Sequence, residues 1–254
     1  MLNKFKILVI FFSIIFVSHE VYPATNNAEL IKQKWPFNGI FGRFDKSSLQ
    51  RGFKVYKEIC AACHGIRHIS YRDLAGIGYT EDEIKIIAGE YEIIDGPDDE
   101  GELFTRDAKP SDKFVGPYEN DKIARLSNNG AYPPDLSLIV KARAGGADYI
   151  YSLLNGYREF PEDFEASEGM YYNEYYPGHQ IAMPSPIMDD VVEFDDGTEA
   201  THLQIARDVT SFLAWTAEPE LEERKSLGVK TLFFLILITI MLLGVKRKVW
   251  KDLD

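Results

Sequence analysis

Cysteine is nearly absent from this chain, with two residues in 254. Both lie in the stretch Cys60-Ala61-Ala62-Cys63-His64. A zinc site would need two more ligands at short spacing, and no further cysteine exists to supply them. A thioredoxin-like redox pair would need a βαβ context, which the flanking sequence does not offer. The scarcity of thiols therefore argues against the two common uses of a bare C-x-x-C pair.

The histidine directly behind the second cysteine completes a different pattern, that of c-type haem attachment. Each thiol can add to one vinyl group of a haem, and the histidine can then ligate the iron from one face. We therefore predict one covalent haem c on Cys60 and Cys63, with His64 as an axial ligand. With both thiols used in this way, no structural disulfide is possible.

Basic residues are also scarce, with 28 Lys and Arg against 40 Asp and Glu. Residues 1–24 carry +1 and residues 230–254 carry +3, so the total of −12 leaves −16 on residues 25–229. Such an acidic surface argues against nucleic acid as a partner. It favours a basic protein partner, attracted by the long-range field, although the same charge can simply keep a domain soluble.

The two ends of the chain have the composition of membrane-directed segments. Residues 1–24 combine Lys4 and Lys6 with an apolar run and predict a secretory signal peptide. Residues 226–246 contain only Lys230 and Lys246 as charges and predict a membrane-spanning helix. Because basic residues follow this span, the positive-inside rule places a tail of residues 247–254 in the cytoplasm. Residues 25–225 then form an exported haem domain.

Hydrophobic periodicity predicts helices in that domain. Leu49, Phe53, Tyr56 and Ile59 form one apolar stripe, so we expect a helix capped by Ser47 or Ser48 that ends near Cys60. A short helix is expected after a cap at Asp135 or Ser137, and another over residues 147–154. The last soluble helix is expected to start at Thr198 and to end or kink at Pro219. Its expected apolar face consists of Leu203, Ala206, Val209, Phe212 and Leu213.

The stretch from 95 to 102, within an acidic segment at 92–102, has the sequence DGPDDEGE. Such charge runs are usually solvated loops. A docking surface for a partner is the alternative function of this segment.

Methionine is scarce too, and this limits the choice of a second axial ligand. Of five methionines, Met1 falls in the signal and Met241 in the span, which leaves Met170, Met183 and Met188. Met183 lies in Ile-Ala-Met-Pro-Ser-Pro, where the prolines stiffen the loop and reduce the entropy lost on ligation. Spacing alone favours Met183 but leaves Met188, His179 and His68 open.

These residues together resemble the cytochrome c1 family over about residues 35–250. The resemblance rests on the haem motif and on several further stretches: Arg51–Tyr56, Asn128–Ala131, Pro133–Ser137, Ala142–Arg143, Gly145–Gly146, Ser152–Leu154, Tyr175–Gly178, Ile181–Met183, Glu193–Thr198 and Ala217–Glu220. It implies a mainly α fold, a cytochrome-c-like helical haem domain with long loop insertions and one C-terminal transmembrane helix.

The resemblance also implies particular site residues. It places His64 and Met183 on the iron. It implies that the carbonyl of Pro134 accepts a hydrogen bond from the histidine ring, which would fix the ring's orientation. Arg143 and Tyr149 match positions that contact haem propionates, whose charge needs such partners when buried.

The function implied is that of an electron-transfer subunit of a quinol:cytochrome c reductase, with no catalytic residue of its own. Its implied partners are a cytochrome b subunit, a Rieske iron–sulfur subunit that donates the electron and a c-type cytochrome that accepts it. The short leader is typical of bacteria, so we expect an inner-membrane protein with its haem domain in the periplasm. The alternatives are a membrane-anchored haem sensor or peroxidase with an open sixth iron site, and a scaffold stabilised by haem.

Overall fold

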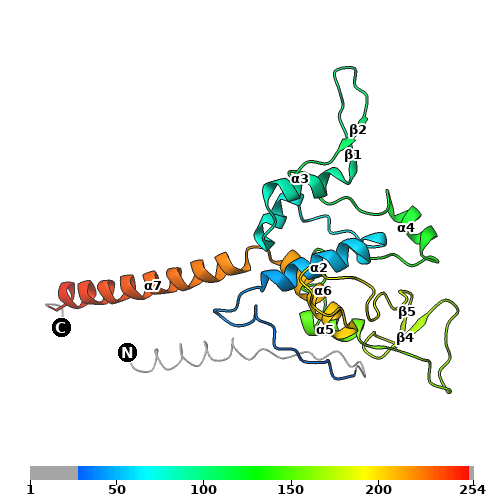
Figure 1. Ribbon diagram of the computed structural model, residues 1–254. Coiled ribbons are helices and arrows are strands. Elements are labelled where there is room, and N and C mark those ends of the chain that lie inside the picture. The colour runs from blue at the N-terminus through cyan, green and yellow to red at the C-terminus, as the bar shows by residue number, and fades with distance from the viewer. Residues whose placement is uncertain (1–27, 252–254) are drawn as a thin grey trace.

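The computed structural model describes residues 28–251, so the predicted signal peptide lies outside the described residues. Most of the regular structure is helical (Figure 1). The helical elements are α2 (Lys46–Glu58), η1 (Cys60–Ala62), η2 (Tyr71–Ile77), α3 (Glu81–Gly89), α4 (Asp121–Ser127), α5 (Gly146–Leu154), α6 (His202–Ala217) and α7 (Leu221–Val249). The strands are β1 (Glu92–Asp95), β2 (Phe104–Asp107), β3 (Tyr157–Arg158), β4 (Tyr171–Asn173) and β5 (Gln180–Ile181). The prediction of a mainly α domain with one long apolar C-terminal helix is confirmed.

Helices α2 and α6 form the centre of the domain. The predicted stripe of α2 is buried at Leu49, Phe53 and Tyr56, and it packs on α6 around Phe212. The two backbones approach closely, because a Cβ added at Gly52 would lie 2.1 Å from the carbonyl oxygen of Asp208. Only glycine allows this separation, and it places the end of α2 at a fixed position in the core.

Two predicted caps of these helices are wrong. The carboxylate of Asp45, not Ser47 or Ser48, caps α2 by accepting from the Ser47 backbone N–H at 3.1 Å. Thr201, not Thr198, caps α6. Thr198 lies instead in a turn closed by Asp196, and the later start leaves Leu203 exposed while the other four predicted face residues are buried.

The short helix predicted after Asp135 is absent, because residues 137–142 form consecutive turns. Asp135 does accept from the Ser137 N–H at 2.9 Å, as a cap would. Its other oxygen accepts from the Arg67 N–H at 2.9 Å and so ties this segment to the residues after the haem motif. The next helix, α5, begins at Gly146, one residue before the predicted start.

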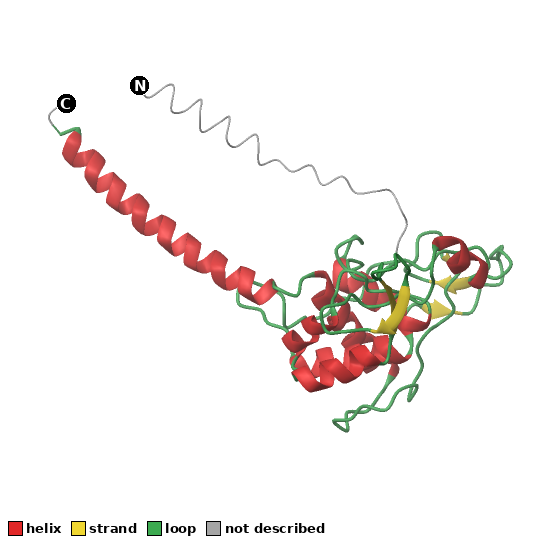
Figure 2. Ribbon diagram, turned by 90° about the horizontal axis from the view of Figure 1, so that it is seen from above, coloured by secondary structure: helices red, strands yellow, loops and turns green. Residues whose placement is uncertain are grey.

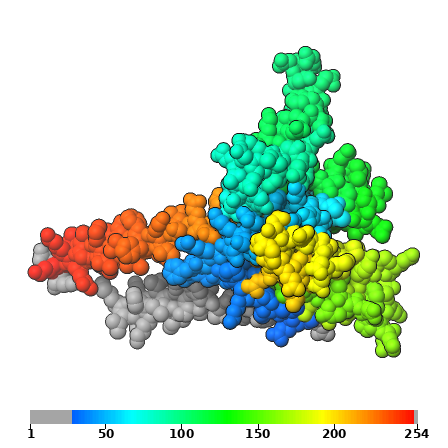
Figure 3. All heavy atoms as spheres, viewed as in Figure 1, coloured from blue at the N-terminus to red at the C-terminus, as the bar shows by residue number. Residues whose placement is uncertain are grey.

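The acidic segment is only partly a loop. Strands β1 and β2 pair antiparallel, with Glu92 opposite Asp107 and Asp95 opposite Phe104. The hairpin projects from the body of the domain (Figures 1 and 3). The prediction of a loop for residues 95–102 is therefore wrong at Asp95, which ends β1, and correct for residues 96–102 between the strands. A second small sheet has the antiparallel order β3-β4-β5.

Helix α7 leaves the domain as a single rod (Figure 2). Among the described residues it is the one helix long and apolar enough to cross a membrane. Its 29 residues span about 43 Å at 1.5 Å per residue, which exceeds the hydrocarbon thickness of a bilayer. Helix α6 ends at Ala217, two residues before Pro219, as predicted. The exact limits of the span, residues 226–246, stay a prediction.

Candidate functional site

The Cys-x-x-Cys-His motif folds as a single tight turn directly after α2. The backbone N–H groups of Cys63 and His64 both donate to the carbonyl oxygen of Cys60, at 3.1 and 2.8 Å. The two cysteines are half-buried and are not joined in a disulfide. Because α2 is packed against α6, this turn presents both thiols and the imidazole from one rigid support.

The thiol environment separates the possible uses of the pair. Burial raises the pKa of the Cys60 thiol to about 12. A redox-active C-x-x-C pair needs the opposite shift, since the thiolate is its nucleophile. Among residues 28–251, no group of three His, Cys, Asp or Glu side chains is placed to hold a metal ion. Both bare C-x-x-C alternatives therefore find no support in this site.

The imidazole of His64 is oriented by the loop that follows α4. Its Nδ1 lies 2.7 Å from the carbonyl oxygen of Pro134, which can only accept, so Nδ1 donates. This leaves Nε2 as the nitrogen that can bind a metal. Burial lowers the pKa of His64, which favours the neutral ring that a metal ligand requires. The Leu136 N–H also donates to the Gly65 carbonyl at 2.8 Å, so the two segments run side by side.

The loop that carries Met183 is fixed at several points. The hydroxyl of Tyr157 donates to the Met183 carbonyl at 3.0 Å. The buried side chains of Ile181 and Ile187 anchor the loop on either side. Met183 itself is half-buried. This arrangement agrees with the stiffness that its flanking prolines predict.

The other sixth-ligand candidates are held less favourably. Met188 is 62% exposed and Met170 is 38% exposed. The ring of His179 stacks on Tyr172 with centroids 5.6 Å apart. His68 is exposed on the surface. Of the three methionines considered for ligation, Met183 is the least exposed residue, and its backbone carbonyl is hydrogen-bonded to Tyr157.

Arg143 and Tyr149 lie near one another at the start of α5. Tyr149 is buried, and this burial raises its pKa, while the positive charge of Arg143 acts in the opposite direction. The guanidinium of Arg143 is exposed and donates to the Ala142 carbonyl at 3.1 Å. The pair combines a cation and a phenol hydroxyl, which are the donors that a carboxylate needs.

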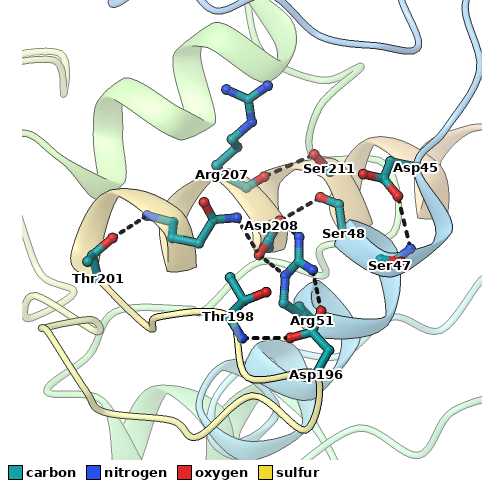
Figure 4. A network of polar contacts seen from close by, with 11 residues as sticks. Asp45, Ser47, Ser48, Arg51, Asp196, Thr198, Thr201, Arg207, Asp208 and Ser211 are labelled. Atoms are coloured by element: carbon teal, nitrogen blue, oxygen red, sulfur yellow. Dashed lines mark hydrogen bonds and ion pairs between the residues drawn. The ribbon is translucent and has the colours of Figure 1, made fainter.

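Sequence reasoning missed a buried ionic network that joins α2 to α6 (Figure 4). The carboxylate of Asp208 is completely buried and accepts from Ser48 Oγ at 2.6 Å, Arg51 Nε at 2.6 Å and Gln204 Nε2 at 2.8 Å. Arg51 Nη1 also donates to Asp196 at 2.6 Å. The network connects the helix before the haem motif with the loop that follows Met183. Asp208 lies among the apolar residues of α6, and this position in the sequence was the signal that could have indicated a buried ionic network.

Two half-buried thiols on one turn and a neutral imidazole oriented through Nδ1 are the donor set that covalent haem requires. Together with the helical domain and the long apolar helix, they define a membrane-anchored c-type haem protein.

Comparison with known proteins identifies the family. The model of the Cytochrome C1 family matches residues 35–253. Cytochrome c1 of Rhodospirillum rubrum is 48% identical over 239 residues, covering 88% of each chain. A mitochondrial cytochrome c1 haem protein of Arabidopsis thaliana is 49% identical over 230 residues, covering 91% of this chain and 75% of its own. The chain belongs to the cytochrome c1 family, whose members are haem-carrying subunits of the bc1 complex with covalently bound haem c.

Proposed function

We propose that this chain takes one electron from a Rieske-type iron–sulfur subunit and passes it to a c-type cytochrome. The orientation of His64 by the Pro134 carbonyl is the observation that carries this proposal, because it prepares Nε2 as a permanent ligand. When bound, haem c supplies a one-electron carrier. In this proposal Cys60 and Cys63 would hold the porphyrin, and His64 and Met183 would be the protein ligands of its iron.

The role of Met183 rests on the rigidity of its loop. A thioether is a soft ligand that favours reduced iron and raises the reduction potential. The Tyr157 hydroxyl at 3.0 Å and the flanking prolines hold the Met183 backbone before any ligand bond forms. A ligand held in this way moves little between the two oxidation states, as an electron carrier needs.

Arg143 and Tyr149 are proposed to hold a haem propionate. Tyr149 offers the hydroxyl group of a largely buried side chain, and the exposed guanidinium of Arg143 lies close enough to influence the pKa of that phenol. A charged carboxylate at this place would gain a charge-assisted hydrogen bond from the arginine.

The proposed partners and topology are supported by the charge of the chain and by the names of its relatives. A charge of −16 on residues 25–229 suits a basic cytochrome as acceptor. A relative from Bradyrhizobium diazoefficiens named "Cytochrome b/c1" is 46% identical over 241 residues, and this chain matches 35% of its length. Its name supports a cytochrome b subunit as partner. The basic residues after α7 favour a cytoplasmic C-terminus, with the haem domain in the periplasm of a bacterial inner membrane.

The test is carbon monoxide binding to the reduced, haem-loaded protein. The wild type should bind none, whereas Met183→Leu should bind it readily and show a lowered potential. Met188→Leu is the matched control, since this methionine is exposed five residues further on and should change neither property. Carbon monoxide binding by the wild type would favour the sensor or peroxidase alternative. An unchanged Met183→Leu variant would assign the sixth ligand to another residue.

A further inference from the structure

The loop before α2 exposes two large apolar side chains although its base is buried. Trp35 and Phe37 are in the core. Two turns follow, closed by the Asn38 N–H on the Trp35 carbonyl at 3.1 Å and the Gly42 N–H on the Gly39 carbonyl at 3.4 Å, and the Arg43 N–H closes the whole loop on the Pro36 carbonyl at 3.0 Å. At the tip, Ile40 is 68% exposed and Phe41 is 84% exposed. Residues 38–42 are called the apolar loop below.

The apolar loop is fastened to the first turns of α7. The Lys225 ammonium donates to the carbonyl oxygens of Phe37 at 2.6 Å and Gly42 at 3.2 Å, one on each side of the tip. The Phe44 N–H donates to the Glu222 carboxylate at 3.0 Å. The loop therefore lies at the level of residues 222–225, immediately before the predicted membrane span.

The figures agree with this placement. The blue segment before α2 reaches toward the side on which α7 leaves the domain (Figure 1). A cavity of about 280 Å³ lies between the apolar loop and the start of α7, with Phe37, Phe44, Val140 and Leu221 in its wall. The wall also contains Asn38, Lys141, Glu218 and Lys225, so apolar and polar side chains are mixed between the base of the apolar loop and the first turn of α7.

We infer that the apolar loop inserts Ile40 and Phe41 into the bilayer interface beside α7. Aromatic and aliphatic side chains at this depth gain by leaving water, and phenylalanine is common on the apolar face of interfacial anchors. The charges nearest the loop are the exposed Arg43, Lys225, which donates to the Phe37 and Gly42 carbonyls, and Glu222, which accepts from the Phe44 N–H just outside the loop.

A second membrane contact, made by the apolar loop, would restrict the orientation of the domain on the membrane. A single helix leaves the domain able to rotate about the helix axis, whereas two contacts fix which face of the domain is turned to the membrane. The inference rests on α7 spanning the bilayer and is independent of which residues ligate the iron.

The test places a nitroxide label at residue 41. In the haem-loaded full chain both native thiols are proposed to be in thioether bonds, so Phe41→Cys carries the one reactive thiol. Ile94→Cys, on the projecting hairpin and 73% exposed, is the aqueous control, and Phe234→Cys in α7 is the bilayer control. The proteins are placed in phosphatidylcholine vesicles, and collision with oxygen is compared with collision with a water-soluble nickel chelate by electron paramagnetic resonance.

The ratio of oxygen to nickel collisions at residue 41 should exceed that at residue 94 several-fold and approach that at residue 234. Adding Ile40→Asp should lower the ratio at residue 41 while leaving the haem spectrum unchanged. A ratio equal to that at residue 94 would overturn the inference, as would a label shielded from both reagents, which indicates a protein contact. Labelling of the wild-type chain would instead show that the haem attachment proposed above is wrong.

Discussion

Replacing Arg51 with methionine should destabilise the domain more than breaking a solvent-exposed ion pair of similar geometry. The variant keeps the aliphatic stem but leaves the Asp208 carboxylate, whose side chain is 1% exposed, without its cation. Removing one partner of a buried ion pair typically costs about 3–5 kcal/mol, because the remaining charge is uncompensated. Ser48 and Gln204 still donate to Asp208, so we expect the lower end of this range, about 3 kcal/mol.

Lys54→Met is the matched control for this prediction. Lys54 lies on the same helix and pairs with Asp195 at 2.6 Å, the same distance as the pair of Arg51 and Asp208. Asp195 is 86% exposed, however, and an ion pair in solvent contributes less than about 1 kcal/mol. The two aspartate pairs therefore have the same distance and differ in burial, and the second pair that Arg51 forms, with Asp196, is partly exposed and adds little.

The free energy of unfolding of each variant is measured by denaturant unfolding of the haem-loaded protein in detergent, followed by circular dichroism. The two values are compared with the same dependence of this free energy on denaturant concentration. Adding Asp208→Asn to Arg51→Met should recover part of the loss, because the buried charge is removed while the amide oxygen can still accept from Ser48. Equal losses for Arg51→Met and Lys54→Met would refute the reasoning, since burial would then have no effect on the energy of the pair.

Three further changes test other parts of the structure. Gly52→Ala should cost about 1–3 kcal/mol in the same unfolding assay, because the new Cβ would lie 2.1 Å from a backbone oxygen of α6. Hydrogen bonds from Thr198, aided by Arg51, lower the pKa of Asp196 from 3.8 to about 2. The charged Asp196 therefore stabilises the folded protein above about pH 4, and this contribution is lost as the pH falls toward 2. Asp196→Asn should therefore be less stable than the wild type at neutral pH, with the gap closing in that window; a gap independent of pH would contradict this. Tyr157→Phe removes the hydrogen bond to the Met183 carbonyl, worth about 1 kcal/mol, and should speed displacement of the native sixth ligand by added imidazole, whereas unchanged rates would show that the loop is held without it.

The parts of the fold that were predicted well depend on neighbouring residues. The apolar stripe of α2 and the break near Pro219 follow from local periodicity and from the geometry of proline. The caps were predicted less well. Asp45, Ser47 and Ser48 are all good capping residues, and the choice among them depends on Ser48 being used by Asp208, a residue 160 positions away.

The site residues also fall into two groups, those that the local sequence predicts and those that contacts between distant segments position. The motif from Cys60 to His64 encodes its own chemistry within five residues, and its turn needs only local hydrogen bonds. The contact between His64 and Pro134 could be predicted only from the family resemblance, because no periodicity relates positions 70 residues apart. The ionic network of Arg51 was not predicted at all, since an arginine on a helix is usually solvated.

The sequence by itself determined that this chain carries covalent haem and one apolar helix, because a short reactive motif and a long apolar run need no distant partner to be recognised. The tertiary structure decided which way the imidazole faces, how the Met183 carbonyl is held by Tyr157 and which carboxylate is buried between α2 and α6. Those choices depend on contacts between segments far apart in the chain, where packing and desolvation are settled only when the segments meet.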